Sequence, residues 1–560
     1  MRGVKKMTTK VQNPILPGFH ADPSICRMGG DYYIATSTFE WFPGVRIHHS
    51  RDLVNWEVVS MPLSTTKLLD MEGVEASGGI WAPCLSYSNG LFYLIYTVVK
   101  GHLNPVFETP NYLTTAPSIQ GPWSAPIYLN SSGFDPSLFH DDDGRKWLVN
   151  MERDYRKAMR GENWFVGIVL QEYDERQKKL VGKPVNIFRG TDLMCTEGPH
   201  LYKRNGWYYL MCAEAGTGYE HAETLARSRS IEGPYEVHPK NPVLTSWEGP
   251  RNGLPSGQCP RGKLYEMGPS YIKKAGHASI CDTPEGRWLM VHLCGRPLPG
   301  TDCCVLGRET SIQEVEWRED DWLYLKHGGN HPMEYLELPG EIPVREELKK
   351  SGVRVEYGFE SQEEFNGKFL MDFQTLRMPR DPMDINVTAR PGWLRMVGRE
   401  SIFSRFRQSL MARRQVDFSF RAETVMEFHP EDYTQSAGLI WRYDEDNQYY
   451  LFISFDNETA RLTVNVITVV QGKVVRFETL PIENEAGIFT LGVEVHEHGG
   501  RFYYLEKGEK KSIGGYLDAC CLSDDRINGA FTGAFVGICV QDVRDQKQYA
   551  DFRSFVYEAQ

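Results

Sequence analysis

The strongest constraint on the fold is a layout that recurs five times within the first 340 residues. Each copy has a short apolar stretch, a tight turn that contains glycine, and a second stretch rich in aromatic and aliphatic residues. Such a pattern is typical of two antiparallel strands joined by a hairpin turn. The aligned positions of the five copies are Pro23, Pro83, Pro136, Pro199 and His277.

The spacing of the copies predicts how they are arranged. Consecutive aligned positions lie 60, 53, 63 and 78 residues apart, which is room for one four-stranded sheet with its loops. Five such sheets placed around an axis form a β-propeller, which leaves only short strand edges exposed. Unrelated hairpins in a sandwich would not explain five copies in register. We therefore predict a five-bladed β-propeller over residues 1–338.

The rest of the chain has a different character. Residues 339–352 combine Pro and Gly with a run of charged residues, as a linker does. Over residues 353–560 the repeat is absent, and apolar and polar residues alternate along longer segments, the period of half-buried strands. The predicted strands include Asp417–Glu427, Ser436–Arg442, Tyr449–Phe455 and Leu462–Val470. We expect an all-β protein whose second domain is a β-sandwich of lectin-like jelly-roll type.

Charge and composition narrow the partners. The chain has 62 Lys and Arg against 74 Asp and Glu, a net charge of −12 with His neutral. This balance argues against nucleic acid or an anionic membrane as the main partner, since both attract basic surfaces. No apolar stretch approaches the roughly 18 residues that a membrane-spanning helix needs.

Two further features bear on location. The basic start, Met1–Lys10, is not followed by an apolar segment of the kind found in export signals. The twelve cysteines are irregularly spaced and form no CxxC motif, so we expect mostly free thiols in a reducing compartment. Both features favour a cytoplasmic protein.

Carboxylates recur at one position of the repeat. The first strand of each propeller blade lines the central axis, so the starts of these strands converge on one face. Asp22, Asp135 and Glu197 stand there, at or just before the shared position. Either Asp alone would be explained by turn chemistry, in which Asp caps its own backbone. Because the carboxylates recur at one position of the repeat, here called the column, they instead favour a shared site. Glycoside hydrolysis needs such a group of side chains, with one carboxyl protonated and one ionised.

Other candidate site residues surround this column. Sugar rings present apolar faces that stack on aromatic side chains, and Trp81 and Phe134 immediately precede column positions. Each could equally be a core residue. His277, at the fifth position, is a candidate metal ligand on the axis, with a hydrogen-bonded structural histidine as the alternative.

Four motifs carry a resemblance to a known family. Asn13–Ser24, Phe134–Ser137, Thr196–Tyr202 and Gly307–Thr310 resemble the signatures of glycoside hydrolase family 43. The two-domain layout resembles that of the longer β-xylosidases in this family. The resemblance implies a five-bladed propeller and hydrolysis with inversion of configuration.

The resemblance also implies roles for individual residues. Asp22 would be the general base, Glu197 the general acid, and Asp135 the residue that tunes the pKa of Glu197 and orients it. Arg308 would bind substrate hydroxyl groups. Three aromatic residues would shape the first sugar subsite: Trp81, Phe39 and Phe134.

In the resembling xylosidases, a loop of the second domain closes the pocket with an aromatic residue. Phe531 is the nearest match here and Phe535 the competitor. A closed pocket admits only the chain end, which implies exo action. In some members the counterpart of His277 binds a calcium-centred water cluster, whereas others work without metal. The resemblance therefore requires no cofactor and keeps calcium as a candidate.

The sequence thus predicts an exo-acting β-1,4-xylosidase that releases D-xylose from the non-reducing end of xylo-oligosaccharides with inversion. Two alternatives stay open. One is an α-L-arabinofuranosidase or a bifunctional enzyme, because the two sugars present similar hydroxyl groups. The other is a non-catalytic carbohydrate-binding propeller. The resemblance also implies a homo-oligomer, either a dimer or a tetramer.

Overall fold

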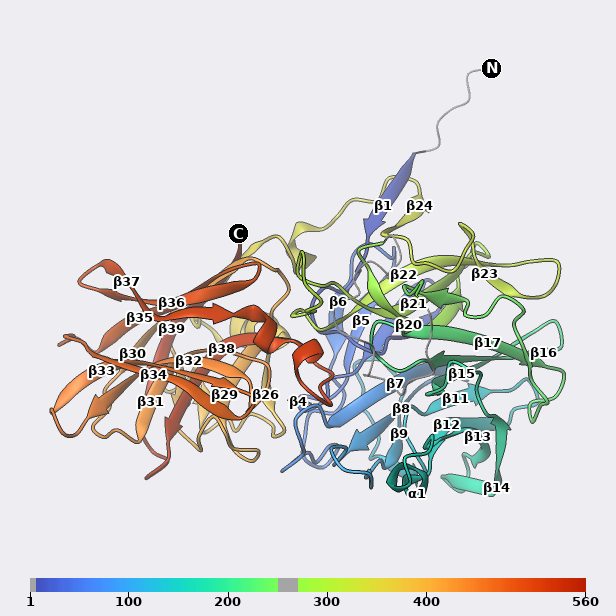
Figure 1. Ribbon diagram of the computed structural model, residues 1–560, viewed down its shortest axis with the longest axis horizontal. Coiled ribbons are helices and arrows are strands. Elements are labelled where there is room, and N and C mark those ends of the chain that lie inside the picture. The colour runs from blue at the N-terminus through green and yellow to red at the C-terminus, as the bar shows by residue number, and fades with distance from the viewer. Residues whose placement is uncertain (1–6, 250–269) are drawn as a thin grey trace, which may run out of the picture.

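The computed structural model describes residues 7–249 and 270–560, so most of the basic segment Met1–Lys10 lies outside it. Figure 1 shows two strand-rich bodies side by side, the N-terminal one running from blue to yellow-green and the C-terminal one from orange to red. Helices are few and short. Within the described residues, none is long and apolar enough to span a bilayer. The all-β fold class is confirmed.

The N-terminal body consists of five antiparallel sheets that follow one another along the chain. Blade 1 contains β2 (Ser24–Met28), β3 (Asp31–Thr36), β5 (Arg46–Ser50) and β6 (Glu57–Ser60). Blade 2 contains β7 (Gly79–Ser88), β8 (Leu91–Val99), β9 (Asn111–Ala116) and β10 (Ile127–Asn130). Blade 3 contains β11 (Ser137–His140), β12 (Lys146–Arg153), β13 (Phe165–Asp174) and β14 (Lys179–Phe188), with helix α1 (Tyr155–Met159) before β13.

The last two blades follow the same plan. Blade 4 contains β15 (Glu197–Arg204), β16 (Trp207–Glu214), β17 (Ala222–Ser228) and β18 (Glu236–Val237), and β19 (Leu244–Thr245) also pairs with β17. Blade 5 contains β20 (Lys273–Asp282), β21 (Trp288–Gly295), β22 (Arg308–Trp317) and β23 (Leu323–Leu325). Each predicted hairpin joins the first two strands of a blade, and the five-bladed propeller is confirmed.

The two ends of the propeller segment are tied together. Strand β1 (Thr8–Gln12) pairs antiparallel with β24 (Tyr335–Pro339), well separated in sequence but adjacent in space (Figure 1). Directly after β1, the Asn13 side chain donates to the carbonyl oxygens of Ile312 and Met333 and accepts from the Ile312 N–H, at 2.8–3.0 Å. One buried asparagine thus fixes the N-terminal segment against blade 5.

A left-handed backbone residue recurs in each blade, two residues before the first strand in blades 1 and 3 and within it in blades 2, 4 and 5. The φ angles are 51°, 36°, 54°, 55° and 50° at Asp22, Ala82, Asp135, Gly198 and His277. This corrects the sequence alignment in blade 5, because His277 corresponds to Asp22 rather than to Pro23. Ala278 takes the proline position, so no proline marked the register there.

Serines next to the column connect neighbouring blades across the axis. The Ser279 hydroxyl donates to the Pro23 carbonyl (3.0 Å) and accepts from the Ile25 N–H (2.9 Å). The Ser137 hydroxyl donates to the Pro199 carbonyl at 2.6 Å. The serine at this position of the repeat therefore bonds the first strands of two neighbouring blades together.

The C-terminal body is a sandwich of two antiparallel sheets. One sheet has the order β27 (Ile385–Asn386), β28 (Leu394–Val397), β39 (Tyr549–Ala559), β30 (Phe420–Phe428), β35 (Ile488–His496), β36 (Gly499–Glu506) and β37 (Glu509–Asp518), and β25 (Arg354–Tyr357) also pairs with β39. The other has the order β34 (Lys473–Pro481), β33 (Arg461–Val470), β32 (Gln448–Asp456), β31 (Gln435–Arg442), β38 (Phe535–Asp542), β29 (Ser409–Arg414), β26 (Phe373–Leu376) and β4 (Trp41–Phe42). The four strands predicted above correspond to β30 to β33, within three residues at each end, and the sandwich is confirmed.

Short helical turns complete the C-terminal body. They are η2 (Glu346–Leu348), α2 (Gln362–Glu364), η3 (Phe365–Phe369), α3 (Leu370–Asp372), η4 (Ala519–Leu522) and η5 (Asp524–Arg526). The predicted limits of propeller, linker and sandwich stay a prediction.

The two bodies share strands and core. Strand β4 belongs to the propeller segment yet pairs with β26 of the sandwich. The ring of Trp41 in β4 stacks on Phe535 of β38, with centroids 3.7 Å apart and planes at 13°. Both residues belong to one buried apolar cluster that spans the two bodies. This continuous core fixes the sandwich against the propeller and lets loops of one complete a site on the other.

Candidate active site

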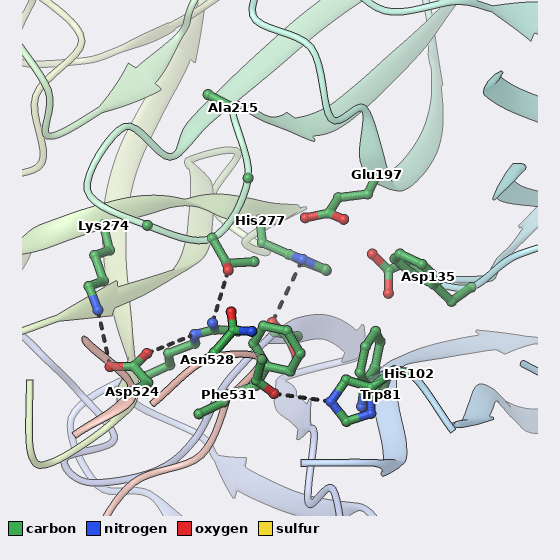
Figure 2. Close-up of a pocket in the computed structure, with 18 of the residues that line it drawn as sticks. Trp81, His102, Asp135, Glu197, Ala215, Lys274, His277, Asp524, Asn528 and Phe531 are labelled. Atoms are coloured by element: carbon green, nitrogen blue, oxygen red, sulfur yellow. Dashed lines mark hydrogen bonds and ion pairs between the residues drawn. The ribbon is translucent and has the colours of Figure 1, made fainter. Parts of the chain in front are cut away.

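A pocket of about 460 Å³ lies where the first strands begin. Asp22, Asp135 and Glu197 all line it, so the structure brings together the three carboxylates of the repeat column. His277 and Arg308 line it as well. Figure 2 shows the labelled side chains of Glu197, Asp135 and His277 projecting into one space. Residues separated by more than 250 positions thus form a single polar cluster.

The position of Asp22 is set by the start of blade 1. Its left-handed backbone conformation, which Asp tolerates better than most residues, turns the chain immediately before Pro23. The Ser37 hydroxyl donates to Oδ2 at 2.7 Å, and His277 Nδ1 lies 3.7 Å from Oδ1. These neighbours hold the Asp22 carboxylate toward the axis.

Asp135 and Glu197 are linked through the glycine between blades. The Gly198 N–H donates to Asp135 Oδ2 at 3.1 Å, so the residue after Glu197 is fixed by the neighbouring carboxylate. Gly198 has φ 55°, and a Cβ there would lie 3.0 Å from the His277 ring. Only glycine fits this crossing without a shift, which explains the Glu197-Gly198-Pro199 motif.

The electrostatics of the cluster favour retention of a proton. Burial, and then the charge of Asp22, raise the pKa of Glu197 to about 8. Burial and the charges of Glu197 and Asp22 raise the pKa of Asp135 well above its usual range. Like charges in a buried site cannot all be ionised. At neutral pH the trio therefore keeps at least one proton, which a general acid requires.

Arg308 supplies the positive charge beside this cluster. It begins β22 and is 4% exposed. Its Nη2 donates to the Thr217 hydroxyl at 3.0 Å, and its Nε lies 3.6 Å from Asp524 Oδ2. The guanidinium carbon lies 4.7 Å from the centre of the Phe531 ring. The guanidinium is thus held rigidly at the pocket, as a group that binds hydroxyls should be.

Aromatic rings form the apolar wall of the pocket. The Trp81 ring centroid lies 5.9 Å from Phe39, 5.3 Å from Phe134 and 5.2 Å from Phe531. The indole N–H of Trp81 donates to the Ser77 carbonyl at 2.9 Å, which fixes the orientation of the ring. The four predicted aromatic residues, Phe39, Trp81, Phe134 and Phe531, therefore pack together in one cluster.

The structure distinguishes between the two candidates for pocket closure. Phe531 lines the pocket, and Figure 2 shows its ring on the side opposite Glu197, near Trp81. Phe535 is fully buried in β38, where it packs on Trp41 and Phe19. Phe531 is therefore the aromatic residue that the sandwich contributes to the pocket, and Phe535 belongs to the core.

The loop that carries Phe531 is anchored to the propeller. The Phe531 N–H donates to the Ser77 hydroxyl at 3.0 Å, and the Ala534 N–H donates to the Val305 carbonyl at 3.0 Å. A Cβ on Gly307, whose φ is 75°, would lie 2.3 Å from the Thr532 carbonyl oxygen. The Gly-Arg-Glu-Thr motif thus begins with glycine because the sandwich loop passes directly over it.

Sequence reasoning missed several residues of this wall. Lys274 Nζ lies 3.2 Å from Asp524 Oδ1 and 2.8 Å from Asp525 Oδ1, and all three line the pocket. His102 Nε2 lies 3.0 Å from the Gly529 carbonyl, and its ring centroid lies 5.4 Å from that of Trp81. The Asp-Asp-Arg run shortly before Phe531 was the available signal for the acidic pair. Nothing in the sequence marked His102.

In the part of the chain that the structure describes, side chains alone do not form a calcium site at His277. Calcium takes about six to eight oxygen ligands. Burial lowers the pKa of the His277 imidazole, and its Nδ1 faces Asp22 across 3.7 Å. Among the described residues, no group of three or more His, Cys, Asp or Glu side chains is placed to hold a metal ion. A calcium ion held at His277 through water molecules, as the resemblance implies for some members of the family, stays a prediction.

Comparison with known proteins identifies the family. The family model described as glycosyl hydrolases family 43 matches residues 11–323, which contain the whole carboxylate cluster. The chain belongs to this family. A second model, described as the beta xylosidase C-terminal concanavalin A-like domain, matches residues 362–558. The resemblance inferred from the four motifs is confirmed, and the protein is a glycoside hydrolase rather than a non-catalytic binding propeller.

The similarity extends over both domains. Xylosidase/arabinosidase 43B of Humicola insolens is 49% identical over 98% of this chain and 97% of that protein. A beta-xylosidase of Bacillus subtilis (strain 168) is 44% identical over 98% of this chain and 99% of its own. The crystal structure of xylan beta-1,4-xylosidase from Bacillus halodurans C-125 has a TM-score of 0.87 and 47% identity, and covers 98% and 100% of the two chains.

Proposed function

We propose that this family 43 enzyme is an exo-acting β-1,4-xylosidase that releases D-xylose from the non-reducing end of xylo-oligosaccharides with inversion. The observation that carries the proposal is the cluster of Asp22, Asp135 and Glu197 inside a pocket walled by aromatic rings. The names of the relatives, beta-xylosidase and xylan beta-1,4-xylosidase, support the choice of sugar.

Each carboxyl group has a separate task in the proposed reaction. Glu197 donates its proton to the glycosidic oxygen as the bond to the anomeric carbon breaks. Asp22 takes a proton from the water that attacks the opposite face of the sugar. An inverting pair needs about 6.5–9.5 Å between these groups to leave room for that water. Asp135 acts as a positioning residue, because its carboxylate accepts the Gly198 N–H and so fixes the residue next to Glu197.

The pocket walls account for exo action. Phe531 and its loop come from the sandwich and stand over the rings of Trp81 and Phe39. One sugar ring fits among these faces, and Arg308 donates hydrogen bonds to its hydroxyl groups. The rest of the oligosaccharide then has to extend outward, so cleavage is confined to the chain end.

A second activity, removal of α-L-arabinofuranose, is favoured by one finding. The Humicola insolens relative is named a xylosidase/arabinosidase. Xylopyranose and arabinofuranose present similar hydroxyls to Arg308, although their rings differ in size. We propose that the arabinofuranosidase activity is secondary to the xylosidase activity.

The test is a comparison of kcat/KM on xylobiose and on an arabinofuranosyl xylo-oligosaccharide. We expect xylobiose to be preferred and both to be hydrolysed from the non-reducing end. A preference for the arabinosyl substrate would make arabinofuranosidase the main activity and xylosidase the secondary one. Failure to hydrolyse either would refute the proposed substrate class while leaving the family unchanged.

We further propose that the carboxylates work without a metal cofactor. The basis is the donor set around His277 described above. Treatment of the enzyme with a chelator, followed by exhaustive dialysis, should leave xylobiose hydrolysis unchanged. Loss of activity that added calcium restores would refute this proposal.

Location and assembly are proposed on separate grounds. Buried thiols such as Cys26, Cys84 and Cys212 support a reducing, cytoplasmic compartment. Fractionation of cells that produce the protein would test this location. The homo-oligomer implied by the family resemblance is tested by light scattering after size-exclusion chromatography, where a monomer mass would refute it.

A further inference from the structure

A second cavity, of about 420 Å³, lies between the propeller and the sandwich. His20 lines this cavity and Asp22 lines the active-site pocket, so one short segment contributes to both. Its lining is strongly basic, with eight Lys and Arg residues: Lys10, Arg46, Arg296, Arg345, Lys349, Lys350, Arg413 and Arg414. Among the lining residues that the structure describes, Asp372 is the one carboxylate.

Three of these arginines are deeply buried. Arg46 in β5 is 3% exposed, and Arg413 and Arg414, adjacent in β29, are 3% and 5% exposed. Within the described parts of the chain, none of the three has a carboxylate oxygen within ion-pair distance. A buried cation without a counter-charge is costly, so this arrangement requires an explanation.

Their hydrogen bonds go to neutral groups instead. Arg46 Nη2 donates to the Met371 carbonyl at 2.7 Å. Arg414 Nε donates to the Phe19 carbonyl at 2.6 Å, and its Nη1 donates to the Gln374 side chain at 2.5 Å. Arg413 Nη1 donates to the Tyr357 hydroxyl at 2.8 Å. These contacts orient the guanidinium groups but do not neutralise them.

Each guanidinium also keeps a buried donor without a partner among the described residues. The atoms are Arg46 Nε, Arg413 Nε and Arg414 Nη2. Native proteins leave few buried donors unsatisfied, and each one calls for a missing water, ion or ligand. These three atoms are themselves closed off from the cavity, so they mark under-satisfied arginines beside it rather than donors that face it.

The pKa values of the groups around the cavity also favour a negatively charged ligand. Burial, followed by the charge of Arg46, lowers the pKa of Arg414 well below its usual range. Burial lowers the pKa of Arg46 to about 10. The rings of His20 and His48 lie 4.7 Å apart, and burial and the nearby arginines lower the pKa of both well below the usual value. The histidines are therefore neutral and add no counter-charge.

Asp372 compensates only part of this charge. Its Oδ1 lies 3.3 Å from Lys350 Nζ, and its Oδ2 accepts a hydrogen bond from the Tyr357 hydroxyl at 2.7 Å. One carboxylate is thus shared among Lys350, Arg413 and Arg46, and the lining keeps an excess of positive charge. Asp372 also repels any second anion, which makes it a useful site for a test.

We propose that this cavity binds a phosphate group, either as free inorganic phosphate or as the phosphate of a small monoester. Arginine is the preferred partner of phosphate because its planar fork offers several donors at once. A tetrahedral oxyanion with up to two charges matches cations that converge from β5, β29 and the segment around Lys350 better than a planar carboxylate with one. The volume exceeds that of inorganic phosphate, so an ester group can also be accommodated.

The mouth of the cavity supports entry of an anion. Lys10, Arg345 and Lys349 line it and are exposed to solvent. Two of the three belong to the charged run that the sequence assigns to the linker. Clustered exposed cations raise the local concentration of an anionic ligand. The linker thus forms part of a binding site as well as joining the two bodies.

Isothermal titration calorimetry of the full-length enzyme tests the proposal. The protein is titrated, in phosphate-free buffer of low ionic strength, with inorganic phosphate and separately with glycerol 3-phosphate. We expect saturable binding at one site per chain. A crystal soaked in selenate, a tetrahedral oxyanion located by its anomalous signal, should show the anion within hydrogen-bond distance of Arg414.

Two variants with opposite expected effects make the test specific. Lys350→Met removes a partly exposed cation at the cavity and should weaken phosphate binding roughly tenfold. Asp372→Asn removes the single lining carboxylate and should tighten binding by a similar factor. Lys179→Met makes the same charge change on an exposed residue of β14, remote from the lining, and should change nothing. Unfolding cannot produce tighter binding, so Asp372→Asn remains decisive if another variant is unstable.

The outcomes separate clearly. Tighter binding of glycerol 3-phosphate than of phosphate supports the monoester as the source of the group, and equal or weaker binding supports the free anion. The absence of saturable binding by both ligands overturns the proposal. Equal affinities in all three variants would place the anion elsewhere and overturn it as well.

Discussion

Two pockets of the enzyme have similar volumes, about 460 and 420 Å³, and opposite electrostatics. The active-site pocket gathers three carboxyl groups behind aromatic rings, whereas the second cavity gathers three arginines beside one carboxylate. Both lie between propeller and sandwich, and the segment from His20 to Asp22 contributes to each. Because buried like charges destabilise a fold, each cluster indicates a task that outweighs this cost.

The two pockets resolve their excess charge differently. In the acidic pocket a proton can reside on Glu197, whose pKa is raised to about 8. Arginine cannot lose its proton so readily, so the basic cavity calls for an external anion. The first pocket is therefore suited to proton transfer and the second to binding.

The largest expected effect comes from the acidic pocket. Asp22→Asn and Glu197→Gln should each reduce kcat on xylobiose by roughly 10²–10⁴-fold, because each removes a general acid–base group. The measurement is steady-state kinetics, with circular dichroism to verify folding. Near-normal turnover by either folded variant would remove that residue from the mechanism.

A change of leaving group distinguishes the acid from the base. A nitrophenyl xyloside needs little protonation as it departs. Glu197→Gln should therefore recover much of its kcat on this substrate, whereas Asp22→Asn should not. The opposite pattern would exchange the two roles.

The aromatic wall should affect binding more than the chemical step. Phe531→Ala removes a ring that contacts Trp81 and Phe39. We expect roughly a tenfold or larger rise in KM for xylobiose, the equivalent of about 1.5–3 kcal/mol of lost apolar contact. The matched control is Phe535→Leu, which should lower thermal stability and leave KM unchanged. Equal effects on KM would mean that Phe531 acts only through the core.

The pH profile should respond to two neighbours of Glu197 in opposite directions. Because Glu197 must be protonated, kcat/KM should fall as pH rises through about 8. Arg308 lowers the pKa of Glu197, so Arg308→Met should move this limb to higher pH. Asp22→Asn removes the charge that, after burial, raises the pKa of Glu197, and should move the limb of its residual activity to lower pH. If neither variant moved the limb, another group would control it.

The smallest expected effects concern stability and contrast the two pockets. Burial raises the folded-state pKa of Glu197 above its unfolded value, so its contribution to stability is lost as pH rises toward 8. Glu197→Gln should therefore raise Tm by a few degrees at pH 8 and by less at pH 5. Asp372, whose pKa is lowered by Lys350 and Arg413 against the effect of burial, stabilises the fold at neutral pH. Asp372→Asn should lower Tm at pH 7. If both variants changed Tm in the same direction, the contrast between the two pockets would be contradicted.

The propeller and its carboxylates could be predicted because their signals are local. Each blade repeats a hairpin in about a dozen residues, and Asp22 and Asp135 share an Asp-Pro-Ser motif. The register of blade 5 was misplaced by one residue because Ala278 stands where the other blades have proline. The choice between Phe531 and Phe535 needed the structure, since both are aromatic residues of one short segment.

The remaining features depend on contacts between distant segments. Lys274 meets Asp524 across 250 residues, and His102 meets Gly529 across 427. The basic cavity combines β5, β29 and the linker, whereas the sequence alone predicts only that residues 339–352 are a linker. The alternation of apolar and polar residues predicts where a strand lies. It does not predict which loop of the other domain packs over the end of that strand.

The most direct test of the mechanism is the configuration of the sugar first released. Hydrolysis of xylobiose by the wild-type enzyme is followed by the anomeric proton signals in NMR from the earliest time points, before mutarotation. The account predicts that α-xylose appears first, since Asp22 directs water to the face opposite the leaving group that Glu197 protonates. Initial release of β-xylose would mean retention of configuration and would contradict these roles.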